Sequence, residues 1–134
     1  MTALVDIEGI GESYAAKLAA AGATTVEKLL ELGSSPKGRK NLAEKSGVSD
    51  ALILKWVNHC DLFRIKGVAG EYSELLEAAG VDTVVELAQR KPENLLTKMQ
   101  EVNTAKKLVR HMPVLTQVAS WVDQAKQLPR IITY

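Results

Sequence analysis

The feature that most constrains the fold is a 23-residue segment that occurs twice. The first copy, IEGIGESYAAKLAAAGATTVEKL, begins at Ile7, and the second, IKGVAGEYSELLEAAGVDTVVEL, begins at Ile65. The copies align without a gap at a constant offset of 58 residues, and ten of the 23 positions are identical. Ungapped identity at this level indicates an internal duplication, so both copies are expected to adopt the same local fold.

Each copy has the start and stop signals of a helix, a turn and a second short helix. Gly22 and Gly80 stand where the first helix should end in a left-handed turn. Thr24, followed by Glu27 at capping-box spacing, is expected to cap the next helix, and Asp82 is its counterpart in the second copy. Each copy is therefore expected to form a helical pair.

The rest of each half corresponds more weakly. Ser35-Pro36 predicts the start of a further helix and Gly47 its end. GVSDALILKWV and VNTAKKLVRHM are expected to be matching helices, capped by Ser49 with Asp50 and by Asn103. A last amphipathic helix is indicated by apolar residues at 3–4 spacing, namely Leu115, Val118, Ala119, Val122 and Ala125.

No segment shows the sustained alternation of a strand, so the expected fold is all-α. At 134 residues the chain suits one domain or two very small ones. We expect two halves packed as one compact helical domain. The first half covers residues 1–64, and the second covers residues 65–134 with the C-terminal amphipathic helix.

Both copies resemble the helix-hairpin-helix motif. The residues that carry the resemblance are Ile7, Gly9-Ile10-Gly11, Tyr14, Leu18, Gly22 and Leu29 in the first copy, and Ile65, Gly67-Val68-Ala69-Gly70, Tyr72, Leu76, Gly80 and Leu87 in the second. The whole chain also resembles an uncharacterised bacterial family built from tandem motifs of this kind. The resemblance implies two helix-hairpin-helix halves, in which hairpin N–H groups could contact a DNA phosphate from a helix N-terminus.

The charges beside the hairpins oppose that role. Glu8 and Glu12 flank the first hairpin, and Glu71 follows the second. A carboxylate about 5 Å from a phosphate costs on the order of 1–3 kcal/mol at an intermediate dielectric. The anion preference of a helix terminus is worth only about 0.3–1 kcal/mol. We therefore interpret the hairpins chiefly as structural corners, with Ile10 and Val68 filling the space between helices.

Basic residues offer another nucleic-acid surface. Lys37, Arg39 and Lys40 cluster at a helix start, while Lys106, Lys107 and Arg110 are expected on one helix. Such clusters can follow a phosphate backbone. They can also be solvated faces, or they can meet the acidic hairpin segments. Net charge alternates along the chain, at −3, +4, −5 and +5 over residues 1–33, 34–66, 67–89 and 90–134, so head-to-tail association is a further alternative.

Catalysis has little support in the sequence. His59 and Cys60 are adjacent, and adjacent residues on a helix do not face each other. Cys60 is the only cysteine, and no His or Cys pair has metal-ligand spacing, so we expect neither a metal nor another cofactor. Trp56 and Trp121 are expected to pack in the core or between the two halves. No catalytic residue is assigned.

The favoured interpretation is a non-catalytic binding module that acts on an unknown protein partner or by self-association. The alternative is a DNA- or RNA-binding protein that uses the basic helices, with or without the first hairpin, Gly9, Ile10 and Gly11. The start of the chain lacks a signal-peptide pattern, and no stretch is apolar enough for a membrane span. A cytoplasmic protein without membrane contact is therefore expected.

Overall fold

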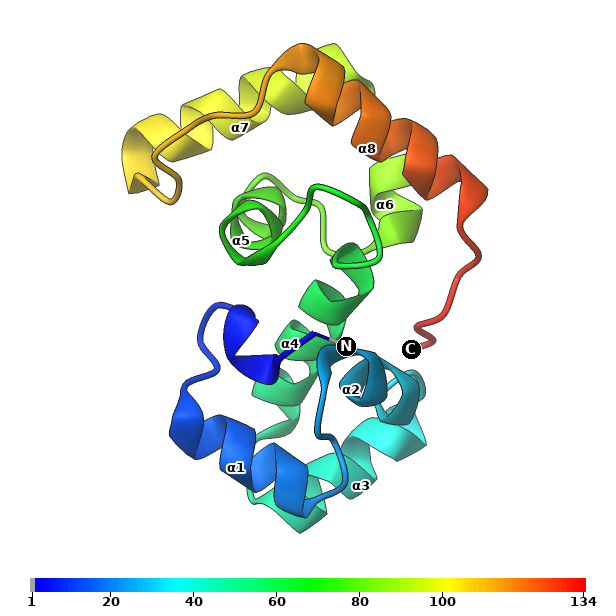
Figure 1. Ribbon diagram of the computed structural model, residues 1–134. Coiled ribbons are helices and arrows are strands. Elements are labelled where there is room, and N and C mark those ends of the chain that lie inside the picture. Colours follow the sequence, from blue (N-terminus) through cyan, green and yellow to red (C-terminus); the bar gives the residue numbers. More distant parts are fainter. Residues whose placement is uncertain (1) are drawn as a thin grey trace. The chain divides into compact units, whose positions relative to one another are not determined.

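The computed structural model describes residues 2–134 of the chain. Over these residues the secondary structure consists of eight α-helices and one short 3₁₀ helix, with no strand (Figure 1). The expected all-α class is therefore confirmed for the described residues. The chain divides into two units: the described residues up to Asp61 together with Ile131–Tyr134, and Leu62–Arg130.

The first unit contains the 3₁₀ helix η1 (Leu4–Asp6), α1 (Glu12–Ala20), α2 (Val26–Leu32), α3 (Pro36–Ser46) and α4 (Asp50–Leu62), whose last residue belongs to the second unit. Helix α3 packs against α1 and α2, and η1 packs against α1. Gly38 allows this approach, because a Cβ there would collide with the Leu32 carbonyl oxygen. The core of the unit is apolar, with Leu18, Leu29, Ile53 and Val57 fully buried.

The second unit contains α5 (Gly70–Ala78), α6 (Val84–Ala88), α7 (Pro92–Lys106) and α8 (Leu115–Gln127). Helix α8 packs against α6 and α7, and α5 packs against α7. The buried face of α8 consists of Val118, Trp121, Val122 and Ala125. Leu115 was expected on that face, but it is 41% exposed, because it is the first residue of the helix.

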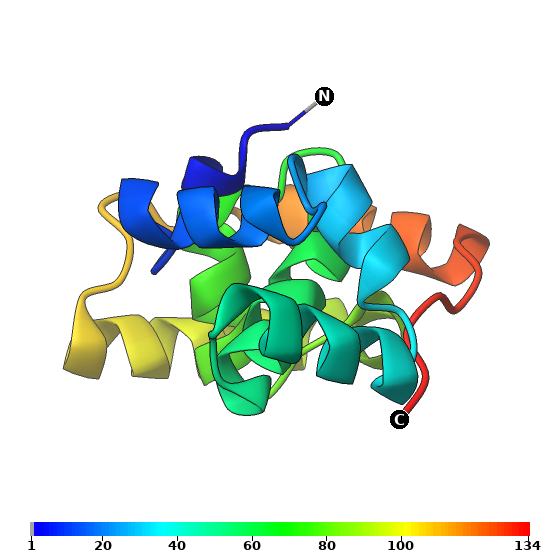
Figure 2. The same cartoon turned by 90° about the horizontal axis from the view of Figure 1, so that it is seen from below.

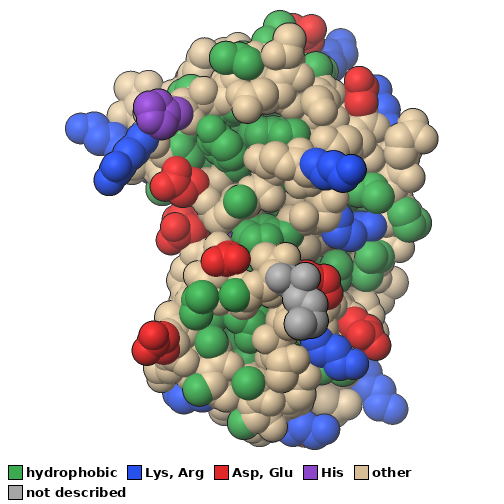
Figure 3. Space-filling model, viewed as in Figure 1, with side chains coloured by type: hydrophobic (Ala, Val, Ile, Leu, Met, Phe, Trp, Pro, Cys, Tyr) green, Lys and Arg blue, Asp and Glu red, His purple; other side chains and the backbone are tan. Residues whose placement is uncertain are grey.

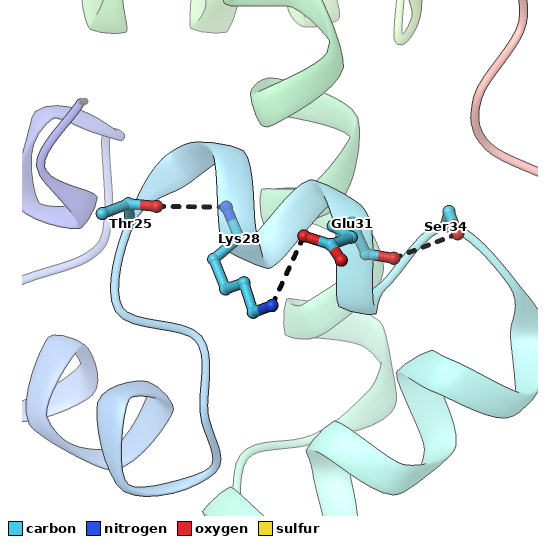
Figure 4. A network of polar contacts seen from close by, with 4 residues as sticks. All are labelled: Thr25, Lys28, Glu31 and Ser34. Carbon is cyan, nitrogen blue, oxygen red and sulfur yellow. Dashed lines mark hydrogen bonds and ion pairs between the residues drawn. The ribbon is translucent and has the colours of Figure 1, made fainter.

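Helix caps explain several of these boundaries. The Thr25 hydroxyl accepts a hydrogen bond from the Lys28 N–H at 3.1 Å, and Lys28 pairs with Glu31 one turn later (Figure 4). The cap of α2 is thus Thr25, and that of α6 is Thr83. The expectation of Thr24 and Asp82 was wrong by one residue in each copy. In contrast, the expected cap at Ser35 and the left-handed residue at Gly47 are confirmed.

The two units share local geometry at matching positions. Gly9 and Gly67 have φ angles of +92° and +98°, and Gly22 and Gly80 have φ angles of +101° and +95°. Left-handed backbone of this kind favours glycine because it has no Cβ. The expected left-handed turns at Gly22 and Gly80 are therefore confirmed.

The units differ after their third helices. Residues 47–49 join α3 to α4, whereas residues 107–114 join α7 to α8. The expected helix VNTAKKLVRHM is therefore wrong: Asn103 lies inside α7, and the segment from Lys107 onward is a loop. The counterpart of α4 in the second unit is α8, because Trp121 of α8 takes the place that Trp56 of α4 takes in the first unit.

The C-terminal segment belongs to the first unit, although the sequence placed it with the second half. The Thr133 N–H donates to the Ser34 carbonyl at 2.8 Å. The buried Arg39 guanidinium donates to the Thr133 carbonyl at 2.7 Å and to the Gly33 carbonyl at 2.9 Å. Both views place the C-terminus beside the turn between α2 and α3 (Figures 1 and 2).

Candidate binding surfaces

The first hairpin, residues 7–11, is a tight turn between η1 and α1. The Ile10 N–H donates to the Ile7 carbonyl at 3.1 Å, and both side chains are buried. Gly9 supplies the positive φ, whereas Gly11 has a φ of −89° and open space where a Cβ would stand. Only the first glycine of the Gly-Ile-Gly sequence is therefore required by the backbone.

The second hairpin, residues 65–69, repeats this turn before α5. The Val68 N–H donates to the Ile65 carbonyl at 3.1 Å, and Val68 is 5% exposed. Ala69 precedes α5 with a φ of −130°, and Gly70 is the first residue of the helix. Alanine replaces glycine at this position without strain, because its backbone is extended.

A tryptophan covers the first glycine of each hairpin. A Cβ on Gly9 would lie 3.4 Å from the Trp56 Nε1 atom, and one on Gly67 would lie 2.9 Å from the Trp121 Nε1 atom. A tyrosine flanks each indole, with ring centroids 5.0 Å apart for Tyr14–Trp56 and 5.3 Å apart for Tyr72–Trp121. Both indoles are at most 2% exposed, which confirms that the tryptophans are core residues.

Of the three basic residues at the start of α3, two are exposed to solvent and one is buried. Lys37 and Lys40 are exposed in the first turns of the helix. Arg39 is 8% exposed, and its guanidinium holds two carbonyl groups and lies 5.6 Å from the centre of the Tyr134 ring. Its role in the described structure is to fasten the C-terminal segment.

The second basic group lies at the end of α7 and in the loop after it, not along one helix as expected. Lys106 is the last residue of α7, Lys107 has a left-handed backbone with a φ of +52°, and Arg110 lies in the loop. All three are exposed, as is His111. Figure 3 shows basic side chains beside a histidine over the loop that follows α7.

This loop is held in one conformation by side chains from three helices, α5, α7 and α8. The Asn103 side chain accepts from the Val109 N–H at 2.9 Å and donates to the Val109 carbonyl at 3.2 Å. The Tyr72 hydroxyl donates to the His111 carbonyl at 2.9 Å. The Gln117 side chain accepts from the Val114 N–H at 2.9 Å, which closes the loop at the start of α8.

Two apolar side chains are exposed at the end of the same loop, where α8 begins. Val114 and Leu115 are 59% and 41% exposed, and residues 102–122 contain no aspartate or glutamate. We call the exposed side chains of residues 106–115 the basic loop; they are Lys106, Lys107, Arg110, His111, Val114 and Leu115. The cations are evident in the sequence, whereas the exposed apolar pair is not, because Leu115 fits the periodicity of α8.

The first hairpin carries the opposite combination. Val5 is 49% exposed at the centre of η1, and Asp6, Glu8 and Glu12 are exposed within the next seven residues. We call Val5, Asp6, Glu8 and Glu12 the acidic patch. The Thr2 N–H donates to the Glu27 carboxylate at 2.7 Å, which ties the start of this segment to α2 and lowers the pKa of Glu27.

A shallow groove of about 340 Å³ lies beside the second hairpin. Gln124 bonds both backbone groups of Lys66, at 2.8 and 3.2 Å, and Arg64 donates to the Pro129 carbonyl at 2.9 Å. These contacts fasten the end of α8 to the hairpin. The groove is lined by Arg64, Lys66, Gln124, Gln127 and Leu128.

The titratable pair in α4 is buried. His59 is 0% exposed and Cys60 is 1% exposed. Burial raises the pKa of the Cys60 thiol, and the Glu27 and Asp61 carboxylates raise it further. A thiol kept protonated in this way is a poor nucleophile, which confirms Cys60 as a small buried residue. Within residues 2–134, no three His, Cys, Asp or Glu side chains are grouped to hold a metal ion.

The fold and these surfaces describe an all-helical protein of two small units. The chain belongs to the family described as Domain of unknown function (DUF4332), whose model matches residues 8–128. No curated protein and no solved structure matches the chain. None of the helices in residues 2–134 has the length and apolar character needed to cross a membrane.

Proposed function

We propose that this chain is a non-catalytic protein-interaction module built from two helix-hairpin-helix units that arose by duplication. The duplication is supported by the ungapped sequence repeat and by the glycine, tyrosine and tryptophan that meet in each unit. In this proposal the protein has no catalytic residue and no cofactor. The proposal also places the protein in the cytoplasm.

The observation that carries the proposal is that exposed apolar and charged side chains occur along one ordered loop, the basic loop. Val114 and Leu115 are exposed on a loop that four hydrogen bonds hold in place. An ordered surface loses little conformational entropy when it binds. Exposed aliphatic residues rimmed by charge are typical of protein interfaces, whereas a phosphate backbone offers them no apolar partner.

Nucleic acid is the second candidate, supported by three exposed cations in a stretch without carboxylates. Two features weigh against it. Glu8 and Glu12 are both exposed beside the first hairpin, where they would repel phosphate. Arg39, one of the cations that the candidate needs, is buried against backbone carbonyls.

A titration with duplex DNA at about 50 and about 150 mM salt separates the two candidates. The proposal expects no saturable binding at the higher salt. Binding that weakens steeply with salt and is lost in the Lys106→Glu, Lys107→Glu variant would replace the proposal with the second candidate. Binding that survives this change but is lost in Gly11→Asp would place nucleic acid at the first hairpin.

A capture experiment tests the protein-binding role directly. Wild-type protein and the Val114→Ser, Leu115→Ser variant are immobilised, and proteins retained by each are compared and then re-tested in purified form. The proposal expects a partner that the variant loses, with both proteins equally folded by circular dichroism. The Lys37→Glu, Lys40→Glu variant is the matched control, because it makes the same charge change as the variant used in the DNA titration, at exposed lysines that are not part of the basic loop.

A further inference from the structure

We propose that the basic loop of one copy of this chain binds the acidic patch of a second copy. This inference rests on the proposed protein-binding role and names the partner. Both surfaces combine exposed apolar side chains with a single sign of charge: Val114 and Leu115 with three cations, and Val5 with three carboxylates.

Charge complementarity selects the acidic patch as the occupant. Lys106, Lys107 and Arg110 give the loop a formal charge of +3, and Asp6, Glu8 and Glu12 give the patch a formal charge of −3. Opposed fields of this kind steer encounter and fix the register of a contact, while like-charged pairings are suppressed. The pairing of loop with loop, or of patch with patch, is therefore disfavoured.

The exposed apolar residues add apolar area to the contact. Val5, Val114, Leu115 and Tyr134 are the large apolar residues exposed in residues 2–134. Val5 is exposed on a 3₁₀ helix, and the two loop residues are consecutive at the start of α8. Burying Val5 against Val114 and Leu115 removes three of these four side chains from water.

Both surfaces are ordered before contact. The N-terminal segment is fixed by the Thr2 N–H bond to Glu27 at 2.7 Å and by the Val26 N–H bond to the Thr2 carbonyl at 2.9 Å. The basic loop is fixed by Asn103, Tyr72 and Gln117. Pre-organisation lowers the entropic cost of a small interface.

The contact is heterologous, because a different surface of each copy takes part. Each copy retains one free surface of each kind after the first contact, so association can continue beyond a dimer into a ring or a chain. Small charged interfaces are weak and sensitive to salt. We therefore expect reversible association that depends on concentration and decreases as salt is raised.

The test is sedimentation equilibrium of the full chain between about 10 µM and about 1 mM, a range suited to weak association. Four samples are compared: wild type, a loop reversal (Lys106→Glu with Lys107→Glu), a patch reversal (Glu8→Lys with Glu12→Lys), and an equimolar mixture of the two reversals. Wild type is expected to gain average mass with concentration at low salt and to lose that gain at about 300 mM salt.

Each reversal alone is expected to remain monomeric, because its loop and its patch then carry the same sign of charge. The mixture is expected to associate again, because the unchanged basic loop of the patch reversal meets the unchanged acidic patch of the loop reversal. The acidic loop of the loop reversal can also meet the basic patch of the patch reversal. Restoration in the mixture depends on complementarity between these two surfaces and does not follow from misfolding. The Lys37→Glu, Lys40→Glu variant should associate as wild type does.

A wild type that stays monomeric at low salt, or a mixture that does not recover association, overturns the inference. The capture experiment then separates the two proposals. A purified protein partner that the Val114→Ser, Leu115→Ser variant loses would keep the protein-binding role and reject only the second copy as its partner. DNA binding that depends on Lys106 and Lys107 would reject both.

Discussion

The indole Nε1 of Trp121 lies 2.9 Å from the point where a Cβ on Gly67 would stand, and the φ angle of Gly67 is +98°. Gly67→Ala is therefore expected to lower the free energy of unfolding by about 2–4 kcal/mol, from left-handed strain and from crowding of the indole. Gly9→Ala should lower the free energy of unfolding by less, about 1–2 kcal/mol, because the Trp56 Nε1 atom lies 3.4 Å from the added Cβ. Urea unfolding measures both.

Gly11→Ala is the matched control for the hairpin glycines. Its φ angle is −89°, and nothing lies within 4 Å of an added Cβ. The change in unfolding free energy should stay within about 0.5 kcal/mol. A loss comparable to that of Gly67→Ala would show that the second glycine carries a constraint that its geometry does not reveal.

Arg39 is expected to hold the C-terminal segment. Arg39→Ala removes two hydrogen bonds from a charged donor and should lower the free energy of unfolding by about 1.5–3 kcal/mol. The Thr133 amide, which donates to Ser34, should exchange its hydrogen faster. Lys40→Ala, an exposed residue of the same helix, should change neither quantity. Equal effects in both variants would contradict the fastening role.

Lys107 has a left-handed backbone, with a φ of +52°, directly after α7. Lys107→Gly should raise the free energy of unfolding by about 0.5–1 kcal/mol, because glycine adopts this conformation without a Cβ clash. Thermal unfolding at neutral pH measures the change. Lys106→Gly is the opposite control, since Lys106 is helical and its replacement by glycine should destabilise by a similar amount.

Glu27 links stability to pH through its bond to the Thr2 N–H. This hydrogen bond holds the pKa of Glu27 below its ordinary value of 4.5. The folded state then binds the proton less readily than the unfolded state, so the stabilisation is present above the ordinary pKa and is lost as pH falls through the lowered value. Glu27→Gln should lower the Tm at pH 7 but not in strong acid. Glu31→Gln, which affects an exposed pair with Lys28, should show a smaller difference at pH 7.

Cys60 should react with thiol reagents only when the chain unfolds. Its side chain is 1% exposed, and burial raises the pKa of its thiol, so neither access nor thiolate is available in the folded state. The reaction rate at pH 8 should rise with urea in parallel with unfolding. Rapid labelling of the native protein would contradict the buried position of this residue.

Local signals in the sequence predicted the helical class, the turns at Gly22 and Gly80 and the start of α3 at Ser35. These features depend on backbone conformation and on neighbours within one turn, which the sequence displays directly. The end of α7 was not predicted, because the local character of Asn103 indicates a helix start. Asn103 has the character of a cap, yet its side chain bonds Val109, six residues later, from inside a helix.

The repeat, the hairpins and the distribution of charge were determined by the sequence alone. The tertiary structure decided which residues are in contact. Trp121 of α8, and not a residue of the segment after Asn103, is the counterpart of Trp56. Arg39 donates a hydrogen bond to Thr133, which lies 94 residues away in the sequence. The tertiary structure also decided that Leu115 is exposed beside Val114. Burial and long-range pairing depend on how helices pack, and periodicity marks an apolar face without showing where a neighbouring helix ends and that face meets water.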